Sequence, residues 1–385
     1  MKGLVFVLLA LCACGETRTN RVDRTESFLE FNEERQIPIH AKSTNFALLT
    51  QLWEDASGEA HLIRMNYFSS NPNYLFINSL NDSTLDLTLE FENEGPHGVG
   101  NVTEFYFHSY DSIFLIDRYQ YRVSLADSSG RVLQSYRIKH SSGNRPDENS
   151  VLPWSSSKSR IFKVGNALYI PVIPDVDPFL TGYQKENLLV ELDLISGECS
   201  SLLGFPNSYK SGEFFGGPEQ IIPSISPYKA LGQYLVSFPL SDSIFLLDIQ
   251  TKKMKPFQWM GSRLREDLNF IDFTERQTDR GKAFQLGTDF YFSVNYDPIR
   301  KEIWRVFYKK YTEESISKML DNQSGGPNQK TLLRISENNT RLEEIEIPLN
   351  SKLNPYDLMV LKDGFFVSFD SLEDRLIFKK ITIRN

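Results

Sequence analysis

Six side chains in polar loops of this chain have the chemistry of ligand-binding residues. Arginine suits bidentate recognition of a carboxylate or phosphate, tryptophan can stack on a sugar or peptide ring, and histidine and glutamate exchange hydrogen bonds with polar groups. We expect these side chains to gather at one ligand site: His97, Arg145, Trp154, Glu219, Arg263 and Arg265. The alternative is that these loops are polar only because connections between strands face water.

Familiar catalytic and cofactor motifs are missing. The chain has no Gly-x-Ser-x-Gly, His-Glu-x-x-His, Walker loop or Cys-x-x-Cys. Its 5 histidines do not pair at a metal-ligand spacing, and His61 lies inside a strand pattern. Asp175-Val-Asp177 lacks the glycine and distal glutamate of a calcium loop. We therefore expect no metal and no cofactor, and the catalytic residues, if any, remain unknown from the sequence.

The charge balance argues against a nucleic-acid partner. The formal net charge is -8 and the pI is about 5.4, whereas binding to a phosphate backbone needs a basic surface.

The first residues form an export signal. Lys2 is followed by an apolar run from Leu4 to Leu11, which is too short to span a bilayer. The ending Leu11-Cys12-Ala13-Cys14 resembles the lipobox of bacterial lipoproteins. That resemblance implies cleavage after residue 13, lipidation of the Cys14 thiol and attachment to a membrane. An ordinary signal peptide with a chance cysteine is the alternative, and Cys12 is the weaker acceptor. Residues 14–25 would form a polar tether.

A disulfide framework is not expected. With Cys12 removed and Cys14 acylated, Cys199 has no partner in the chain. It follows Ser196-Gly197-Glu198 at a strand edge, where a structural role is expected.

The elements that must position these loops are short strands. Runs such as Glu104-Phe-Tyr-Phe-His108 and Tyr234-Leu-Val-Ser-Phe238 alternate apolar and polar residues, as half-buried antiparallel strands do. Turn signals such as Asp127-Ser-Ser-Gly130 separate them. The one helix expected covers 312–320, where Thr312 can cap and two glutamates follow. The fold class is therefore all-β.

An internal repeat indicates a β-propeller. Asp111-Ser-Ile-Phe-Leu-Ile-Asp117 recurs as Asp242-Ser-Ile-Phe-Leu-Leu-Asp248, although the second copy may occupy a different strand of its blade. We expect one propeller over residues 26–385, with blades of four antiparallel strands and an insertion at about 311–330. The N-terminal strand Ser27–Asn32 would complete the last blade. Six blades are expected, with seven as the alternative, and the six are placed at about 43–92, 100–139, 158–206, 220–260, 267–348 and 356–384.

These features together carry a family resemblance. The lipobox, followed by Glu94-Gly-Pro-His-Gly-Val-Gly100 and the strands up to Asp117, resembles the six-bladed propeller lipoproteins of Bacteroidota, which are of unknown function. The resemblance covers most of the mature chain and implies a propeller in the cell envelope. It brings no catalytic motif.

We therefore expect a membrane-anchored, non-catalytic binding or scaffold module with a glycan, peptide or protein as partner. One alternative is a propeller enzyme, a hydrolase or lyase acting on glycans at the mouth of the channel. Another is a protein-interaction platform. The expected location is the outer membrane, on its periplasmic face rather than the cell surface.

Overall fold

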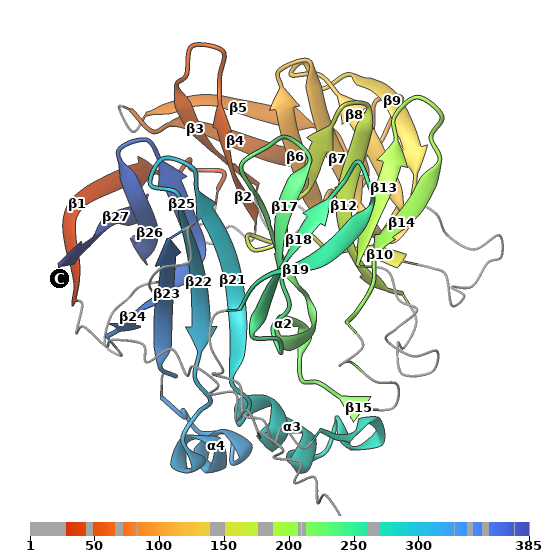
Figure 1. Cartoon of the computed structure of the whole chain (residues 1–385). Coiled ribbons are helices and arrows are strands. Elements are labelled where there is room, and N and C mark those ends of the chain that lie inside the picture. Colours follow the sequence, from red (N-terminus) through yellow and green to blue (C-terminus); the bar gives the residue numbers. More distant parts are fainter. Residues whose placement is uncertain are drawn as a thin grey trace, which may run out of the picture.

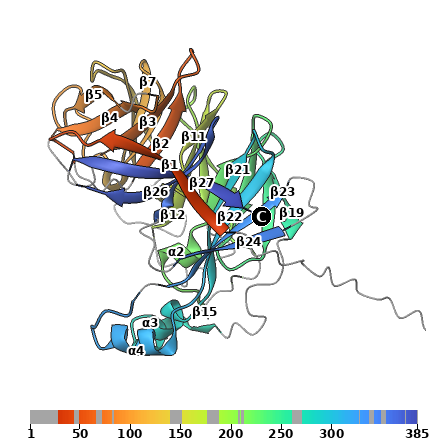
Figure 2. The same cartoon turned by 90° about the vertical axis from the view of Figure 1, so that its left-hand side faces the viewer.

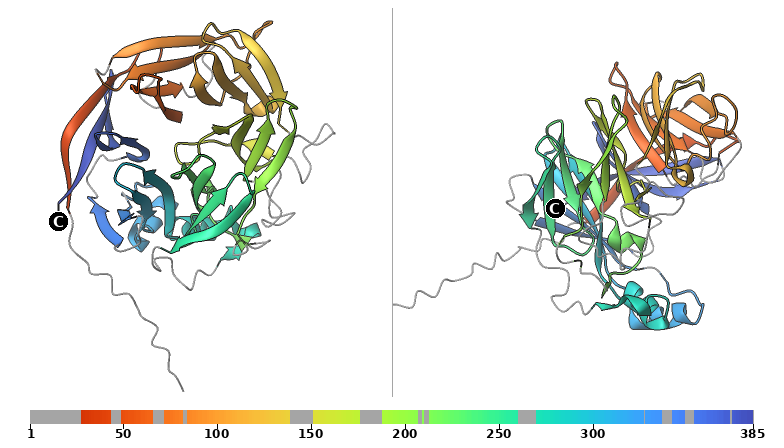
Figure 3. Two further views of the ribbon diagram at one scale, coloured as in Figure 1. Left: turned by 45° about the horizontal axis from the view of Figure 1, so that its top comes forward. Right: turned by 90° about the vertical axis from the view of Figure 1, so that its right-hand side faces the viewer.

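A ring of antiparallel β-sheets makes up this protein (Figure 1 and Figure 3). The computed structural model describes residues 28–43, 49–65, 72–81, 84–138, 151–175, 188–206, 209, 213–259, 270–326, 328–336, 342–348, 354–372 and 374–384. Six blades, and not seven, form the ring, so the expected all-β propeller is confirmed.

Each blade is numbered here along the chain, and its strands are given from the inner one outward. Blade 1 contains β2 (Leu49–Glu54), β3 (Ala60–Met65), β4 (Asn73–Ser79) and β5 (Leu85–Phe91). Blade 2 contains β6 (Glu104–Ser109), β7 (Ser112–Asp117), β8 (Arg122–Ala126) and β9 (Val132–Arg137). Blade 3 contains β10 (Val151–Pro153), β11 (Phe162–Val164), β12 (Ala167–Pro174), β13 (Leu189–Asp193) and β14 (Cys199–Leu203).

The second half of the ring follows the same order. Blade 4 contains β16 (Ser224–Pro227), β17 (Gln233–Ser237), β18 (Ser243–Asp248) and β19 (Lys253–Trp259). Blade 5 contains β21 (Phe290–Asp297), β22 (Glu302–Tyr308), β23 (Lys330–Ser336) and β24 (Leu342–Ile347). Blade 6 contains β25 (Asn354–Leu361), β26 (Gly364–Ser371), β27 (Arg375–Arg384) and, as its outer strand, β1 (Phe28–Pro38).

Blade 6 closes the ring by pairing the two ends of the chain. β1 runs antiparallel to β27, with Phe28 opposite Arg384 and Pro38 opposite Arg375 (Figure 2). This confirms the predicted closure and extends the strand beyond Asn32. Because β1 covers the outer edge of β27, that edge is not left open to pair with another chain.

The alternating strand direction gives the ring two sides. Turns between the first and second strands, and between the third and fourth, lie on one side, which we call the turn side. Turns between the second and third strands, and the connections from blade to blade, lie on the other. We call this the helix side, because α2 (Pro218–Ile221), α3 (Asp279–Leu286) and α4 (Glu313–Leu320) are found there (Figure 1).

The central strands of the blades are buried on both faces. In β22, Val306 packs into a cluster with Phe292 and Leu332, while its neighbour Phe307 packs with Tyr291 and Leu333 in another. Every residue of β4 is buried. The expectation of half-buried strands is therefore wrong for the central strands, because each sheet is covered by a neighbouring blade on both faces. It fits outer strands such as β9, where exposed residues outnumber buried ones.

The helical elements project from blades 4 and 5. β15 (Glu213–Phe214) pairs with β20 (Ile271–Asp272), and the 3-10 helix η3 (Phe273–Glu275) and α3 follow. The predicted helix is confirmed as α4, where the Thr312 hydroxyl accepts a hydrogen bond from the Ser315 N–H at 3.2 Å. None of the helices in the described part of the chain is long and apolar enough to cross a membrane.

Candidate functional site

The inner strand of blade 3 is broken in two. β10 and β11 both pair with β12, β10 with residues 172–174 and β11 with residues 167–169. Residues 154–161 connect them. The Trp154 N–H still donates to the Pro171 carbonyl of β12 at 2.8 Å, and beyond Trp154 the chain leaves the sheet half-way along its length. We call this segment the crossing loop. Its serines (Ser155, Ser156, Ser157 and Ser159) favour turns over strand.

The crossing loop reaches the inner strand of the next blade. Ser159 forms a parallel bridge with Ile225 of β16. The carbonyl oxygen of Lys158 accepts hydrogen bonds from the Ile225 N–H at 2.9 Å and from the Ser224 hydroxyl at 2.8 Å. The loop therefore lies against inner strands, toward the middle of the ring and on its helix side.

Lys158 is the most buried cation of this loop. Its side chain lies over the ring of Phe292, with Nζ 4.9 Å from the ring centroid, and Nζ donates to the main-chain carbonyl of Glu219 at 3.0 Å. The residue is 7% exposed. Burial lowers the pKa of the Lys158 amine to about 7, and the negative charge of Glu219 opposes this shift. The charge of Lys158 therefore responds to pH close to neutrality.

Trp154 begins the same loop and stacks on a cation. The guanidinium of Arg118 lies 4.3 Å from the Trp154 ring centroid, as in a cation–π contact. Arg118 in turn donates to the fully buried carboxylate of Glu104, with Nη2 2.5 Å from Oε1. Burial raises the pKa of Glu104, while Arg118 and the polar groups of Ser155 oppose the rise.

Glu219 lies in α2, next to the crossing loop. It is exposed, next to Pro218 in the first turn. Its charge acts on Lys158, on Lys330 at the start of β23 and on Tyr311. Burial lowers the pKa of Lys330, and Glu219 opposes that shift. Two lysines, a carboxylate and an indole ring are thus gathered around the crossing loop.

The predicted ligand-binding residues lie in different parts of the structure. Trp154 begins the crossing loop, and the main-chain carbonyl of Glu219 accepts a hydrogen bond from Lys158 of the same loop. His97 is exposed in the turn closed by the Gly98 N–H and the Gly95 carbonyl, and makes no hydrogen bond or ion pair with the crossing loop within the described residues. Arg145, Arg263, Arg265 and the predicted lipidation site Cys14 lie outside the described residues.

Sequence reasoning missed Glu104, Arg118 and Lys158. Glu104 and Arg118 lie in strand and turn patterns with no motif around them, and only the folded chain brings Arg118 to Trp154. A weak signal for Lys158 exists, because the serine-rich run 155–159 interrupts what should be an inner strand.

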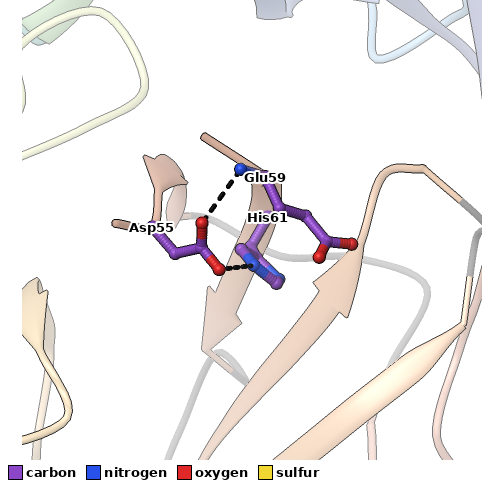
Figure 4. Close-up of side chains that lie close together, drawn as sticks. All are labelled: Asp55, Glu59 and His61. Carbon is purple, nitrogen blue, oxygen red and sulfur yellow. Dashed lines mark hydrogen bonds and ion pairs between the residues drawn. The ribbon is translucent and has the colours of Figure 1, made fainter. Parts of the chain in front are cut away.

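A second cluster lies on the turn side of blade 1 (Figure 4). The β2–β3 hairpin brings Asp55, Glu59 and His61 together, with ligand atoms within 4.8 Å of one another. His61 Nε2 is 3.6 Å from Asp55 Oδ2, and its ring packs on Trp53 at 5.3 Å between centroids. Oxygen and imidazole ligands are those that a divalent cation such as zinc uses.

Hydrogen bonds of the hairpin already occupy these carboxylates. Asp55 Oδ1 accepts from the N–H and hydroxyl of Ser57 and from the Glu59 N–H at 2.7–2.9 Å. These bonds, the Ser57 hydroxyl first, lower the pKa of Asp55 to about 2. Glu59 Oε1 accepts from the Ser79 hydroxyl at 2.7 Å. The hydrogen bonds of the hairpin therefore explain why these three side chains lie together. We place the candidate site at the crossing loop instead.

Comparison with known proteins places the whole arrangement in a family. The family described as "Domain of unknown function (DUF4221)" matches residues 53–324, which is more than half of the chain. The chain belongs to the DUF4221 family. The DUF4221 match includes the Asp55 hairpin, the crossing loop and α4. The predicted resemblance to Bacteroidota propellers of unknown function is thereby confirmed.

Solved structures show the same fold. A DUF4221 member from Bacteroides vulgatus is similar with a TM-score of 0.75 and 15% identity, covering 94% of this chain and 99% of that one. A protein of Bacteroides fragilis classed as exported is similar with a TM-score of 0.56 and 12% identity, covering 95% of this chain and 98% of that one. At these identities the likeness concerns the fold alone. No curated protein matches the chain.

Proposed function

We propose that this DUF4221 protein is a lipid-anchored, non-catalytic binding module of the bacterial cell envelope, with an acidic glycan as ligand. The observation that carries the proposal is the broken inner strand of blade 3. An uninterrupted strand would keep Lys158 in the sheet, whereas the crossing loop, which begins at Trp154, carries Lys158 to the inner strand β16 of the next blade.

The side chains around the loop match the chemistry of a carboxylated sugar. An indole face stacks on a sugar ring. The ammonium groups of Lys158 and Lys330 attract a carboxylate, and the exposed Glu219 can accept hydrogen bonds from sugar hydroxyls. Trp154, Arg118 and Lys330 are half-buried, so each keeps part of its surface in contact with solvent.

Binding should be selective for charge and should weaken as pH rises. We expect calorimetric titration to detect binding of a hyaluronan tetrasaccharide, which carries carboxylates, and not of the neutral tetra-N-acetylchitotetraose. Because the Lys158 amine has a pKa of about 7, it is protonated at pH 6 and largely neutral at pH 8.5. Affinity for the carboxylated ligand should therefore fall roughly tenfold across that range, about 1.4 kcal/mol.

Variants separate the role of Lys158 from general electrostatics. Lys158→Met should lose about tenfold in affinity at pH 6 and should remove the pH dependence, and Trp154→Ala should weaken binding at both pH values. Lys282→Met, which removes an exposed lysine of α3, is the matched control and should bind like the unaltered protein. The proposal would be contradicted by equal affinity for the neutral and acidic tetrasaccharides. It would also be contradicted if Lys158→Met bound the acidic tetrasaccharide with the affinity of the unaltered protein.

The anchor is tested separately. The export signal, the lipobox resemblance and the exported protein of Bacteroides fragilis support an envelope location. We expect the protein made in a Bacteroides host to enter the detergent phase of a Triton X-114 extraction, and Cys14→Ser to move it to the aqueous phase. Cys12→Ser and Cys199→Ser are matched controls that should stay with the detergent. Aqueous partition of the unaltered protein would rule out the anchor.

A further inference from the structure

A buried carboxylate connects the candidate site to blade 2. Glu104 is the first residue of β6, the inner strand of that blade, and is 0% exposed. Its Oε1 accepts two hydrogen bonds from the guanidinium of Arg118, from Nε at 3.1 Å and from Nη2 at 2.5 Å. Because a buried charge needs a paired and hydrogen-bonded partner, the position of Glu104 fixes where this guanidinium lies.

The main chain that carries Arg118 is fixed by its own blade. Arg118 begins η1 (Arg118–Gln120), a 3-10 helix between β7 and β8. The side chain of Asp117 caps this helix by accepting hydrogen bonds from the N–H groups of Tyr119 and Gln120, both at 3.1 Å. Arg118 is therefore held at its main chain by the cap and at its side chain by the buried carboxylate.

The guanidinium of Arg118 reaches across to blade 3. Its Cζ lies 4.3 Å from the centroid of the Trp154 ring, where it covers one face of the indole. η1 itself lies against β10, the strand that ends just before Trp154. The contacts thus run from Glu104 through Arg118 to Trp154, from one blade to the next.

We propose that Glu104 is a positioning residue of the ligand site, which acts through Arg118 to hold the Trp154 indole in one orientation. The inference rests on the proposed function, in which this indole stacks on a sugar ring. Because the guanidinium covers one face of the indole, the sugar stacks on the opposite face. An indole that is fixed before the ligand arrives loses less side-chain freedom on binding, and this raises affinity.

Apolar contacts hold blades 2 and 3 together independently of this ion pair. Phe114 and Ile116 of β7 pack in one cluster with Leu168 and Ile170 of β12, and all four side chains are buried. Loss of the ion pair should therefore loosen the indole without separating the two blades.

Blade 5 offers a matched control with the same three residue types. Glu343 of β24 accepts a hydrogen bond from Arg334 Nε at 2.9 Å, and Arg334 Cζ lies 5.7 Å from the centroid of the Trp304 ring. Trp304 is only 3% exposed, whereas Trp154 is half-buried. Because a buried indole presents no face to a ligand, Glu343→Gln is the control for Glu104→Gln.

The orientation of the indole can be measured without a ligand. When the 4 tryptophans of the chain are replaced by 5-fluorotryptophan, the fluorine NMR resonance that is missing from Trp154→Phe belongs to Trp154. We expect Glu104→Gln to shift and broaden this resonance, because the amide loses the negative charge that holds the guanidinium. Arg118→Lys should do the same, because a compact ammonium cannot both pair with the carboxylate and lie flat on the ring. Glu343→Gln should leave the resonance unchanged.

Affinity supplies the second measurement. Glu104→Gln should bind the hyaluronan tetrasaccharide about tenfold more weakly than the unaltered protein. In a Trp154→Ala background the same change should cause no further loss, because the indole through which Glu104 acts is absent. A purely structural role for Glu104 would instead weaken binding equally in both backgrounds. Glu343→Gln should bind like the unaltered protein.

Two results would overturn the inference. One is an unchanged Trp154 resonance in Arg118→Lys, which decides alone if Glu104→Gln does not fold, since the lysine still neutralises the buried carboxylate. The other is a loss of affinity in Glu104→Gln that persists in full without the Trp154 indole. Failure of the unaltered protein to bind the tetrasaccharide would contradict the proposed function instead, and the fluorine spectra would still decide the role of Glu104.

Discussion

Replacement of Ile37 by aspartate is expected to lower the free energy of unfolding by about 4 kcal/mol or more. Ile37 lies in β1 and is 0% exposed. It packs in a cluster with Leu62 and Leu80 of blade 1 and with Leu376 and Phe378 of blade 6. The change removes a buried aliphatic side chain, which alone costs roughly 2–5 kcal/mol, and forces a carboxyl group into an apolar seam.

The neighbouring residue supplies the control. Gln36 is exposed on the opposite face of β1, where its Oε1 accepts a hydrogen bond from Arg375. Gln36→Asp should therefore change stability by less than about 0.5 kcal/mol. Urea unfolding followed by tryptophan fluorescence measures both variants. Similar stability of Ile37→Asp and Gln36→Asp would show that β1 does not close the ring.

Replacement of Arg305 by leucine is expected to cost roughly 3–5 kcal/mol. The guanidinium of this β22 residue is fully buried, lies 3.3 Å from the Tyr291 ring centroid, and donates to the Ser237 hydroxyl at 2.9 Å. It also donates to three carbonyls of the β17–β18 connection in blade 4: Asp242 at 2.9 Å, Ser241 at 2.6 Å and Phe238 at 3.3 Å. Leucine would leave these buried acceptors without that donor, and this is the costly part of the change.

A lysine variant tests whether the planar guanidinium, and not only its charge, stabilises this contact. Arg305→Lys keeps the charge but loses the planar set of donors, so we expect it to recover only part of the stability. Arg280→Leu on α3 removes an exposed arginine paired with Glu275 at 2.7 Å and should cost less than about 1 kcal/mol. Equilibrium unfolding in guanidinium chloride compares the three. A loss below about 1 kcal/mol for Arg305→Leu would mean that blade 4 does not depend on this contact with blade 5.

The internal repeat predicts that a segment is a blade strand but not which strand of the blade it forms. The two Asp-Ser-Ile-Phe-Leu segments are both blade strands, but β7, buried except for its first residue, is the second strand of blade 2, and β18, of which half the residues are buried, is the third strand of blade 4. The pattern cannot tell these positions apart, because second and third strands are both paired on two edges and covered on both faces. Helix α3 escaped prediction because Asp279–Leu286 has no apolar stripe.

The candidate site shows where sequence reasoning ends. Trp154 and Glu219 were expected in one site because blade-to-blade connections meet on one side of a propeller. Arg118 and Lys158 were not expected, because their roles depend on contacts between residues far apart in the chain. Lys158 approaches Glu219 only because the crossing loop leaves blade 3 and pairs with β16 of blade 4.

The sequence by itself determined the strand-rich class, the closing strand and the capped helix α4, because each depends on local periodicity or on side chains a few residues apart. Tertiary structure decided which strands lie between others and which charges are buried. Those properties come from contacts between blades, and burial alone turns an ordinary lysine such as Lys158 into a group whose charge changes near neutral pH.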